Sequence, residues 1–398
     1  MPEATSETDR SAGSSLRWHR AVVTGFAILF LIVAVWSAVL NLFKSSAGDF
    51  LSFWAAGQLV LRGHPALAYN ISVHGAVENT ITHIGGRLPF PYPPPFLAII
   101  TPFALPIPAV GFILWVATTA IFYAFASSRV APWQYAFGNT PACIQLMIGQ
   151  TGFLMSGIFI LGVTLVSSAP FVAGIVLGCL VMKPQLAVLL PVAMLAGREW
   201  RVIAGAILSS IGLLLIGLLL FGFKSYEGFW NILPFYVDML RNNREPWNEL
   251  ASPFALARFA GVPQTQALWI HSIIALGAAA ATARAWWLKL DERVPILAAA
   301  TMLMSPYLFT YDALLIIIPI GWLVKNQQHP YILAIVWLCC FIPIITYFSP
   351  WLGPNFISVA AMACLWALHK PSRSSGRDRN AAAETVAPGA HRGRPQTI

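Results

Sequence analysis

The stretch AVVTGFAILFLIVAVWSAVLNLF, residues 21–43, contains no charged side chain over 23 consecutive positions. About 20 predominantly apolar residues are enough for a helix to cross the hydrocarbon core of a bilayer, so this stretch predicts a membrane-spanning helix. It is too long for the apolar core of a signal peptide and lacks a small-residue cleavage site, so we expect the helix to be retained. The solvent that decides this fold is therefore lipid.

The composition of the whole chain agrees with this first stretch. Of 398 residues, 58% are hydrophobic and only 10% are Asp, Glu, Lys or Arg, whereas soluble domains carry about 25% charged residues. So few charges cannot cover a water-facing surface, which excludes a soluble globular enzyme. A disordered chain is excluded because its composition is the opposite. We predict an all-α polytopic membrane protein.

The predicted organisation is one integral membrane domain, residues 16–369, between two disordered tails. The tails are the polar residues 1–15 and the basic residues 370–398. We expect about twelve transmembrane helices, at 21–43, 93–106, 107–127, 133–148, 150–168, 170–196, 202–222, 267–288, 294–308, 311–324, 330–348 and 353–369. Several of these segments are short or interrupted by proline, and re-entrant hairpins are an alternative in the region 93–148.

Positive charge predicts the orientation in the membrane. Short basic loops at 198–201 and 284–293, together with the basic C-terminal tail, are expected in the cytoplasm with both termini. Residues 44–92 and 223–266 then form two structured extracytoplasmic loops. In the first loop, apolar residues recur near helical spacing from Phe50 to Leu61, which predicts an amphipathic helix lying on the membrane surface.

Charge and motif content exclude several classes of ligand. The net charge of +9 is too thinly spread for a nucleic-acid partner, while the basic tail suits anionic membrane lipid. The five cysteines lie in apolar runs without metal-ligand spacing, and no Walker loop or Rossmann fingerprint is visible. We therefore expect no metal and no cofactor.

Asp49 is the acidic residue whose position is most suggestive of chemistry. It follows the first span directly and is placed at the outer edge of the bilayer, where it could act as a base toward a polar acceptor. The structural alternative is that Asp49 caps the helix that starts at Phe50, since Asp is among the best capping residues. The two interpretations are compatible.

Two charged residues fall inside apolar segments, where a lone charge is costly. Lys183 precedes Pro184, which breaks the helix, and Gln185 adds a second polar side chain; this point suits a lipid phosphate, or else Lys183 snorkels toward the surface. Asp312 requires a partner or a cavity, unless it caps the start of a helix.

Weaker candidates complete the predicted site. Gln150 lies in an apolar stretch, where it either forms an interhelical hydrogen bond or contacts substrate. Arg241 and Arg244 could contact phosphate, although a solvated loop face also explains them. Tyr92 is a further possible substrate-site residue, with Gln150 and Asp312.

Five segments taken together resemble glycosyltransferase family 87. They are GDFLSFWAAGQLVLRGHPALAYN (48–70), PYPPPFLAIITPFALP (91–106), IGQTGFLMSGIFILG (148–162), KPQLAVLLPVAMLAGREWR (183–201) and SPYLFTYD (305–312). Each motif alone is weak, but their order and spacing are more specific. The resemblance implies a GT-C-like helical bundle related to the polyprenyl-phosphate-mannose-dependent α-mannosyltransferases of actinobacteria.

The resemblance also implies a function. Such a protein, in the bacterial inner (plasma) membrane, would move a hexose, mannose being expected, from a polyprenyl-phosphate donor to a glycolipid or glycan acceptor on the extracytoplasmic side. Asp49 matches the first-loop acid that is the family's proposed base, and Lys183, Gln185, Arg241 and Arg244 are candidates for the donor phosphate. The alternatives are a lipid or sugar transporter or flippase, and a non-catalytic membrane scaffold.

Overall fold

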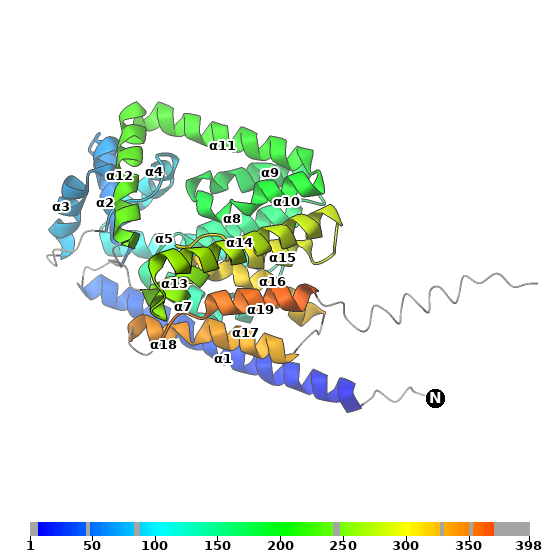
Figure 1. Ribbon diagram of the computed structural model, residues 1–398. Helices are drawn as coiled ribbons and strands as arrows, with labels where there is room; N and C mark the ends of the chain where they lie inside the picture. Colours follow the sequence, from blue (N-terminus) through cyan, green and yellow to red (C-terminus); the bar gives the residue numbers. More distant parts are fainter. Residues whose placement is uncertain are drawn as a thin grey trace, which may run out of the picture.

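The structure is a computed structural model that describes the chain except residues 1–6, 45–47, 83–87, 242–246, 327–329, 350–352 and 370–398. The described residues form helices and no strand, apart from an isolated bridge between Leu250 and Phe309. Most helices run side by side, with α11 along one edge and α1 along the opposite edge (Figure 1). The helix α12 crosses the end of the bundle beside α2 and α3.

The elements follow one another as mostly short helices. The α-helices are α1 (Glu7–Lys44), α2 (Phe50–Leu61), α3 (Ile71–Thr82), α4 (Pro95–Ile100), α5 (Pro108–Ser127), α6 (Trp133–Phe137), α7 (Thr140–Ile148), α8 (Gly152–Leu165), α9 (Pro170–Gly178), α10 (Leu189–Gly197), α11 (Trp200–Phe221), α12 (Phe223–Arg241), α13 (Pro253–Phe259), α14 (Gln264–Trp287), α15 (Arg293–Thr301), α16 (Ile317–Lys325), α17 (Pro330–Phe341), α18 (Pro343–Phe348) and α19 (Ile357–His369). The 3₁₀ helices are η1 (Pro65–Tyr69), η2 (Thr101–Ala104), η3 (Cys179–Met182), η4 (Pro184–Leu186), η5 (Trp247–Glu249) and η6 (Thr310–Ile316).

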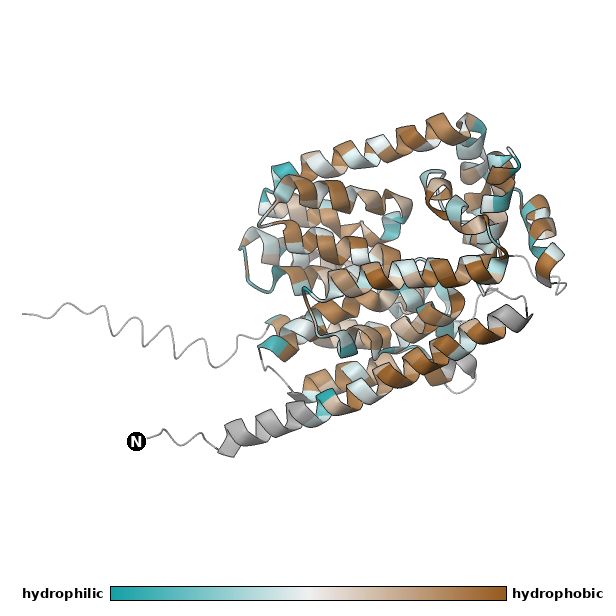
Figure 2. Ribbon diagram, turned by 180° about the vertical axis from the view of Figure 1, so that it is seen from behind, coloured by the Kyte–Doolittle hydropathy of each residue, from teal (hydrophilic) through white to brown (hydrophobic). Residues whose placement is uncertain are grey.

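Among the described residues, four helices are long and apolar enough to cross a membrane: Trp18–Leu40 within α1, and α5, α11 and α14. They correspond to the spans predicted at 21–43, 107–127, 202–222 and 267–288. Apolar residues run along the outer edges of the molecule on α1 and α11 (Figure 2), as expected for surfaces that face lipid tails. The chain is therefore a helical membrane protein.

The other predicted spans consist of shorter pieces, so the number of twelve spans stays a prediction. The segment 133–148 is two helices, because α7 starts anew after Asn139, whose side-chain oxygen accepts a hydrogen bond from the backbone N–H of Ala142. The segment 170–196 is interrupted at Lys183, where η3 ends and Pro184 begins η4. Proline cannot donate the backbone hydrogen bond that would continue a helix.

The prediction that residues 50–61 form an amphipathic helix on the membrane surface is wrong. Nine of the 12 residues of α2 are buried, and the Phe50 and Phe53 rings pack against Trp115 of α5. The side of α2 that carries Gly57 is also covered, since a Cβ there would overlap the Ala104 side chain. Small residues between the aromatic ones let other elements approach α2 from several sides.

The structure describes part of the predicted N-terminal tail and none of the predicted C-terminal tail. The helix α1 begins at Glu7, so residues 7–15 belong to a helix rather than to a disordered tail. The predicted tail 370–398 lies outside the described residues.

The helices α9 and α11 approach each other closely at glycines. A Cβ at Gly174 would overlap the Val202 carbonyl oxygen, and one at Gly205 would overlap the Phe171 carbonyl oxygen. Small residues allow backbones in a membrane to pack directly, where van der Waals contact replaces the hydrophobic effect as the force between helices. This contact fixes α11 against the first half of the interrupted segment 170–196.

We expect Gly205→Ala to lower the unfolding free energy by about 1–3 kcal/mol, since the added methyl forces the two helices apart. Gly212→Ala is the matched control on the same helix, because nothing lies within 4 Å of a Cβ there; it should leave stability unchanged or raise it slightly, by about 0.8–1 kcal/mol at most. Thermal unfolding of each purified variant in detergent measures the difference. Equal midpoints for the two variants would contradict the close contact.

Candidate functional site

A buried ion pair joins the two charged residues that the sequence places inside apolar segments. Lys183 Nζ lies 2.5 Å from Asp312 Oδ1, and both residues are buried, with exposed fractions of 3% and 1%. The ammonium also faces the rings of Tyr311 and Tyr92, with its nitrogen 5.0 Å and 5.8 Å from the two ring centroids. The snorkelling interpretation of Lys183 is therefore wrong, since its charge is compensated inside the bundle.

Local breaks in the helices place both members of this pair. Lys183 has a non-helical backbone (φ −144°, ψ 72°) between η3 and η4, in keeping with the proline that follows, which disfavours the α-helical region for the residue before it. Asp312 lies in the first turn of η6, which starts after the extended residue Phe309. Backbone that leaves the α-helix at membrane depth is tolerated where it is covered by protein, and Lys183 and Asp312 are both buried.

A chain of hydrogen bonds continues from the ion pair toward Asp49. Lys183 Nζ donates to Thr151 Oγ1 (3.1 Å), and Thr151 Oγ1 lies 3.0 Å from Tyr92 Oη. Tyr92 Oη donates to Gln150 Oε1 (3.1 Å), and Gln150 Nε2 donates to Asp49 Oδ2 (3.0 Å). These contacts join six side chains into one connected network, which we call the polar chain: Asp312, Lys183, Thr151, Tyr92, Gln150 and Asp49.

The hydrogen bonds of the polar chain run in one direction. A tyrosine hydroxyl has a single proton, and because Tyr92 donates that proton to Gln150, it must accept one from Thr151. Thr151 in turn accepts from Lys183. Every bond from Lys183 to Asp49 therefore has its donor on the Lys183 side, an order in which each bond polarises the next.

The turn between α7 and α8 holds the middle of the polar chain. Gly149 has a positive φ of 70°, a conformation that favours glycine, and its carbonyl accepts a hydrogen bond from Trp115 Nε1 (2.8 Å). The Gln145 side chain bonds the Gln150 carbonyl and accepts from the Gly152 N–H (3.1 Å). The side chains of Trp115 and Gln145 thus hold the backbone of this turn, and with it Gln150 and Thr151, in place.

Asp49 forms the end of the polar chain that solvent can reach. Its side chain makes no hydrogen bond to the start of α2, so the helix-cap interpretation is not supported. Asp49 and Gln150 are partly exposed, whereas Tyr92, Thr151, Lys183 and Asp312 are buried. Burial raises the pKa of the Asp49 carboxyl, and the hydrogen bond from Gln150 opposes that rise.

A second polar pair lies on α3 beneath α2. His74 Nδ1 is 3.7 Å from Glu78 Oε1, and His74 Nε2 lies 3.0 Å from the Ser52 carbonyl oxygen. Burial lowers the pKa of His74 to about 4 and raises that of Glu78 to about 7, so the histidine is neutral at pH 7 and the contact is no full ion pair. Glu78 has the pKa of a general base, but it is 1% exposed, and Asp49 is the carboxylate that a substrate can reach.

The structure brings together five of the eight residues predicted for the site: Asp49, Tyr92, Gln150, Lys183 and Asp312. Thr151 was not among the predicted residues, although it links Lys183 to Tyr92. The sequence feature that could have identified it is the polar pair Gln150–Thr151 within the apolar stretch IGQTG. Gln185 lies in η4 and is half-buried, without a hydrogen bond to the polar chain. The Arg241 side chain and the whole of Arg244 lie outside the described residues.

The described part of the chain contains acidic, histidine and cysteine side chains that could serve as metal ligands. No three of them lie where they could hold a metal ion. Metal independence stays a prediction.

The comparisons with known proteins gave one result. The family model of glycosyltransferase family 87 matches residues 90–310. The matched segment includes Tyr92, Gln150, Thr151 and Lys183, while Asp49 and Asp312 lie on either side of it. No curated protein and no solved structure matches the chain.

The ion pair can be tested by a double-mutant cycle. Lys183→Met and Asp312→Leu should each lower the unfolding free energy by about 3–5 kcal/mol, because each leaves an uncompensated buried charge. The double variant should lose much less than the sum of the two, since apolar side chains replace both charges. Thermal and denaturant unfolding in detergent measure the coupling; additive losses would show that the two residues do not stabilise each other.

Proposed function

Because the chain belongs to glycosyltransferase family 87, we propose that it moves a hexose, with mannose as the expected sugar, from a polyprenyl-phosphate donor to a glycolipid or glycan acceptor. The chain is thus a membrane glycosyltransferase, with a sugar donor and an acceptor as its substrates. The family match favours transfer over the alternative of a transporter or flippase. The polar chain, which reaches the surface at Asp49, is the observation that carries the proposal.

Asp49 is the proposed general base. Gln150 occupies one carboxylate oxygen, Oδ2, while Oδ1 has no hydrogen-bond partner among the described residues and is the atom that would take a proton. The Gln150 bond keeps the carboxylate in one orientation. A positioned base of this kind accelerates a reaction by about 10²–10⁴-fold.

The proposed step is one displacement at the anomeric carbon. The acceptor hydroxyl oxygen forms a bond to that carbon as its proton passes to Asp49 Oδ1. The bond between the anomeric carbon and the donor phosphate oxygen breaks, and the polyprenyl phosphate leaves with the electron pair. A β-linked donor then gives an α-linked product by inversion.

Lys183 is the proposed partner of the leaving phosphate. An ammonium has three N–H donors, and the bonds to Asp312 and Thr151 use two. The third lies close to Tyr92, and we propose that it turns to a phosphate oxygen, which gains charge as the bond breaks. Asp312 then holds the ammonium in place, and Gln185, Arg241 and Arg244 are further candidates for the phosphate.

The reaction is proposed to take place on the extracytoplasmic side of the bacterial inner membrane. The segments 44–92 and 223–266 carry α2, α3 and α12, which lie together at one end of the bundle (Figure 1). Asp49 belongs to the first of these segments. A lipid-linked donor supplies sugar on that side, where no nucleotide-sugar pool exists.

We expect Asp49→Asn to lower kcat by about 10²–10⁴-fold, because an amide cannot take the acceptor proton. Wild-type kcat should fall as pH falls through the raised pKa of Asp49, since the carboxylate is lost there, and the variant should lack this acidic limb. The measurement is sugar transfer from polyprenyl-phosphate mannose by the purified protein, across pH.

Asp238→Asn is the control for this result, and Lys183→Met tests the donor site separately. Asp238→Asn changes an exposed carboxyl on α12 and should leave kcat unchanged. Lys183→Met should raise the KM for donor more than that for acceptor. Asp312→Asn is unsuitable as a control because Asp312 pairs with Lys183. Near wild-type transfer by Asp49→Asn would refute the base assignment.

The orientation is tested by labelling Ser72→Cys and Ala260→Cys in intact cells with a membrane-impermeant thiol reagent. Both positions are exposed, and they lie in the two segments that we place outside. Labelling of both before lysis is expected. If either cysteine reacts only after the cells are broken, that segment faces the cytoplasm.

A further inference from the structure

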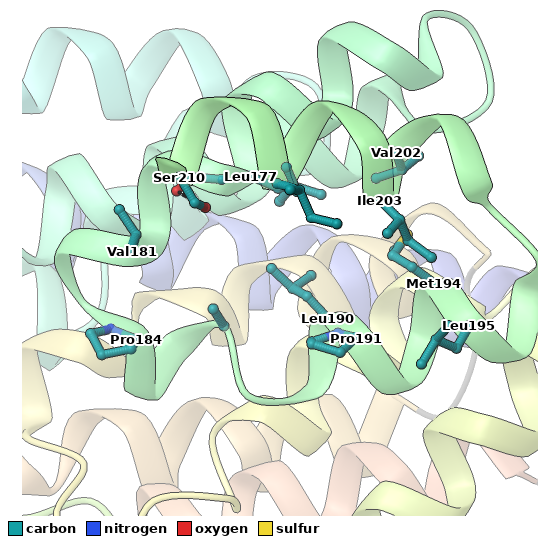
Figure 3. A pocket seen from close by; sticks show the side chains of 14 residues that line it. Leu177, Val181, Pro184, Leu190, Pro191, Met194, Leu195, Val202, Ile203 and Ser210 are labelled. Atoms are coloured by element: carbon teal, nitrogen blue, oxygen red, sulfur yellow. Dashed lines mark hydrogen bonds between the residues drawn. The ribbon is translucent and has the colours of Figure 1, made fainter. Parts of the chain in front are cut away.

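An apolar groove lies between α9, α10 and α11 (Figure 3). It has a volume of about 440 Å³, and its walls include Leu177, Val181, Leu190, Met194 and Ile203. Ser210 is the polar side chain in the lining, and its hydroxyl is engaged by the Gly178 carbonyl oxygen at 3.0 Å. The groove therefore offers no free polar side chain to a ligand.

The interrupted segment 170–196 explains why the groove is open. The glycines of α9 hold that helix tightly against α11, whereas α10 starts after the break at Lys183–Pro184 and packs mainly on α14. The space between α10 and α11 stays unfilled. Leu195 and Ile207, which line it, are 53% and 55% exposed, and α11 is one of the four helices suited to cross a membrane, so the groove faces lipid.

One end of the groove lies at the break in the segment 170–196. Val181 and Pro184, on either side of Lys183 in the sequence, line that end, and Leu195 lies at the other (Figure 3). A hydrocarbon chain in the groove would place the group attached to it at this break, from which the Lys183 side chain enters the polar chain.

We propose that the groove binds the isoprenoid chain of the lipid-phosphate donor and so guides its phosphate to Lys183. This inference rests on the proposed function. An apolar cavity of about 150 Å³ accepts the six carbons of benzene, and in proportion this groove holds roughly 18 carbons, the reactive end of a longer chain.

The chemistry of the lining favours an isoprenoid phosphate over a phospholipid. A polyprenyl phosphate is pure hydrocarbon up to its phosphate oxygen, which matches a groove that is apolar up to Pro184. A diacyl lipid has a second chain, and ester carbonyls and glycerol separate its chains from the phosphate. The groove would leave those polar groups without partners, which is costly in an apolar environment.

The test is photolabelling of the full-length protein in detergent, without any sugar or acceptor. One probe is a polyprenyl phosphate with a diazirine in its first isoprene units, and the other is phosphatidylglycerol with a diazirine in an acyl chain. Mass spectrometry locates the labelled residues. We expect the first probe to label residues 177–210 and the second to label them far less.

A matched pair of variants tests the position of the chain. Ala206 lines the groove, while Ala204, two residues earlier on α11, is exposed and does not. Ala206→Phe should lower groove labelling roughly tenfold, the loss expected when about two methylene contacts are removed, and Ala204→Phe should leave it unchanged. Ala187→Phe, from the opposite wall, is a second blocking variant if Ala206→Phe does not fold.

Equal labelling by the two probes would overturn the proposal, because ordinary membrane lipid would then fill the groove. Labelling outside residues 177–210, or labelling that neither blocking variant reduces, would also overturn it. The result is separate from the proposed function, since the probe carries no sugar. Loss of transfer in Asp49→Asn leaves labelling intact, and a failed groove leaves the base assignment standing.

Discussion

An ammonium group buried inside a helical membrane protein must find a counter-charge, and this constraint organises the centre of the molecule. The pairing of Lys183 with Asp312 requires two segments that lie 129 residues apart in the sequence to leave the α-helix at the same depth. The interruption at Lys183–Pro184 lets the Lys183 side chain reach Asp312, and it also leaves an apolar groove open between α10 and α11. One break in one helix thus supplies both a charged point and the space beside it.

The polar chain extends the influence of this pair to the surface. Thr151 stands at the start of α8 without capping it, and its hydroxyl instead links Lys183 with Tyr92. The turn around Gly149 fixes Thr151 and Gln150 through Trp115 and Gln145. In the proposed reaction, the group that faces the leaving phosphate and the group that takes the proton are therefore held by one rigid set of hydrogen bonds.

The sequence predicts the membrane environment, the four long helices and most members of the polar chain, since a polar residue in an apolar segment needs a partner. It does not identify the partners, because the pairing of Lys183 with Asp312 depends on tertiary packing. Thr151 escapes notice because threonine in an apolar helix commonly bonds its own backbone. The burial of α2 was not predicted because the apolar spacing identifies only one buried face of a helix. Small residues such as Gly57 also form contacts, and their size gives no sign of this in the sequence.

The one-way order of the polar chain limits where a proton can go. Once Asp49 has been protonated, Gln150 still presents an N–H to it, and an N–H cannot receive a proton. Passage inward to Lys183 would require the Gln150 amide to flip and the buried hydroxyls of Tyr92 and Thr151 to turn. In the proposed mechanism the carboxyl of Asp49 therefore loses its proton to the water outside. Each turnover releases one proton on the face where the acceptor arrives.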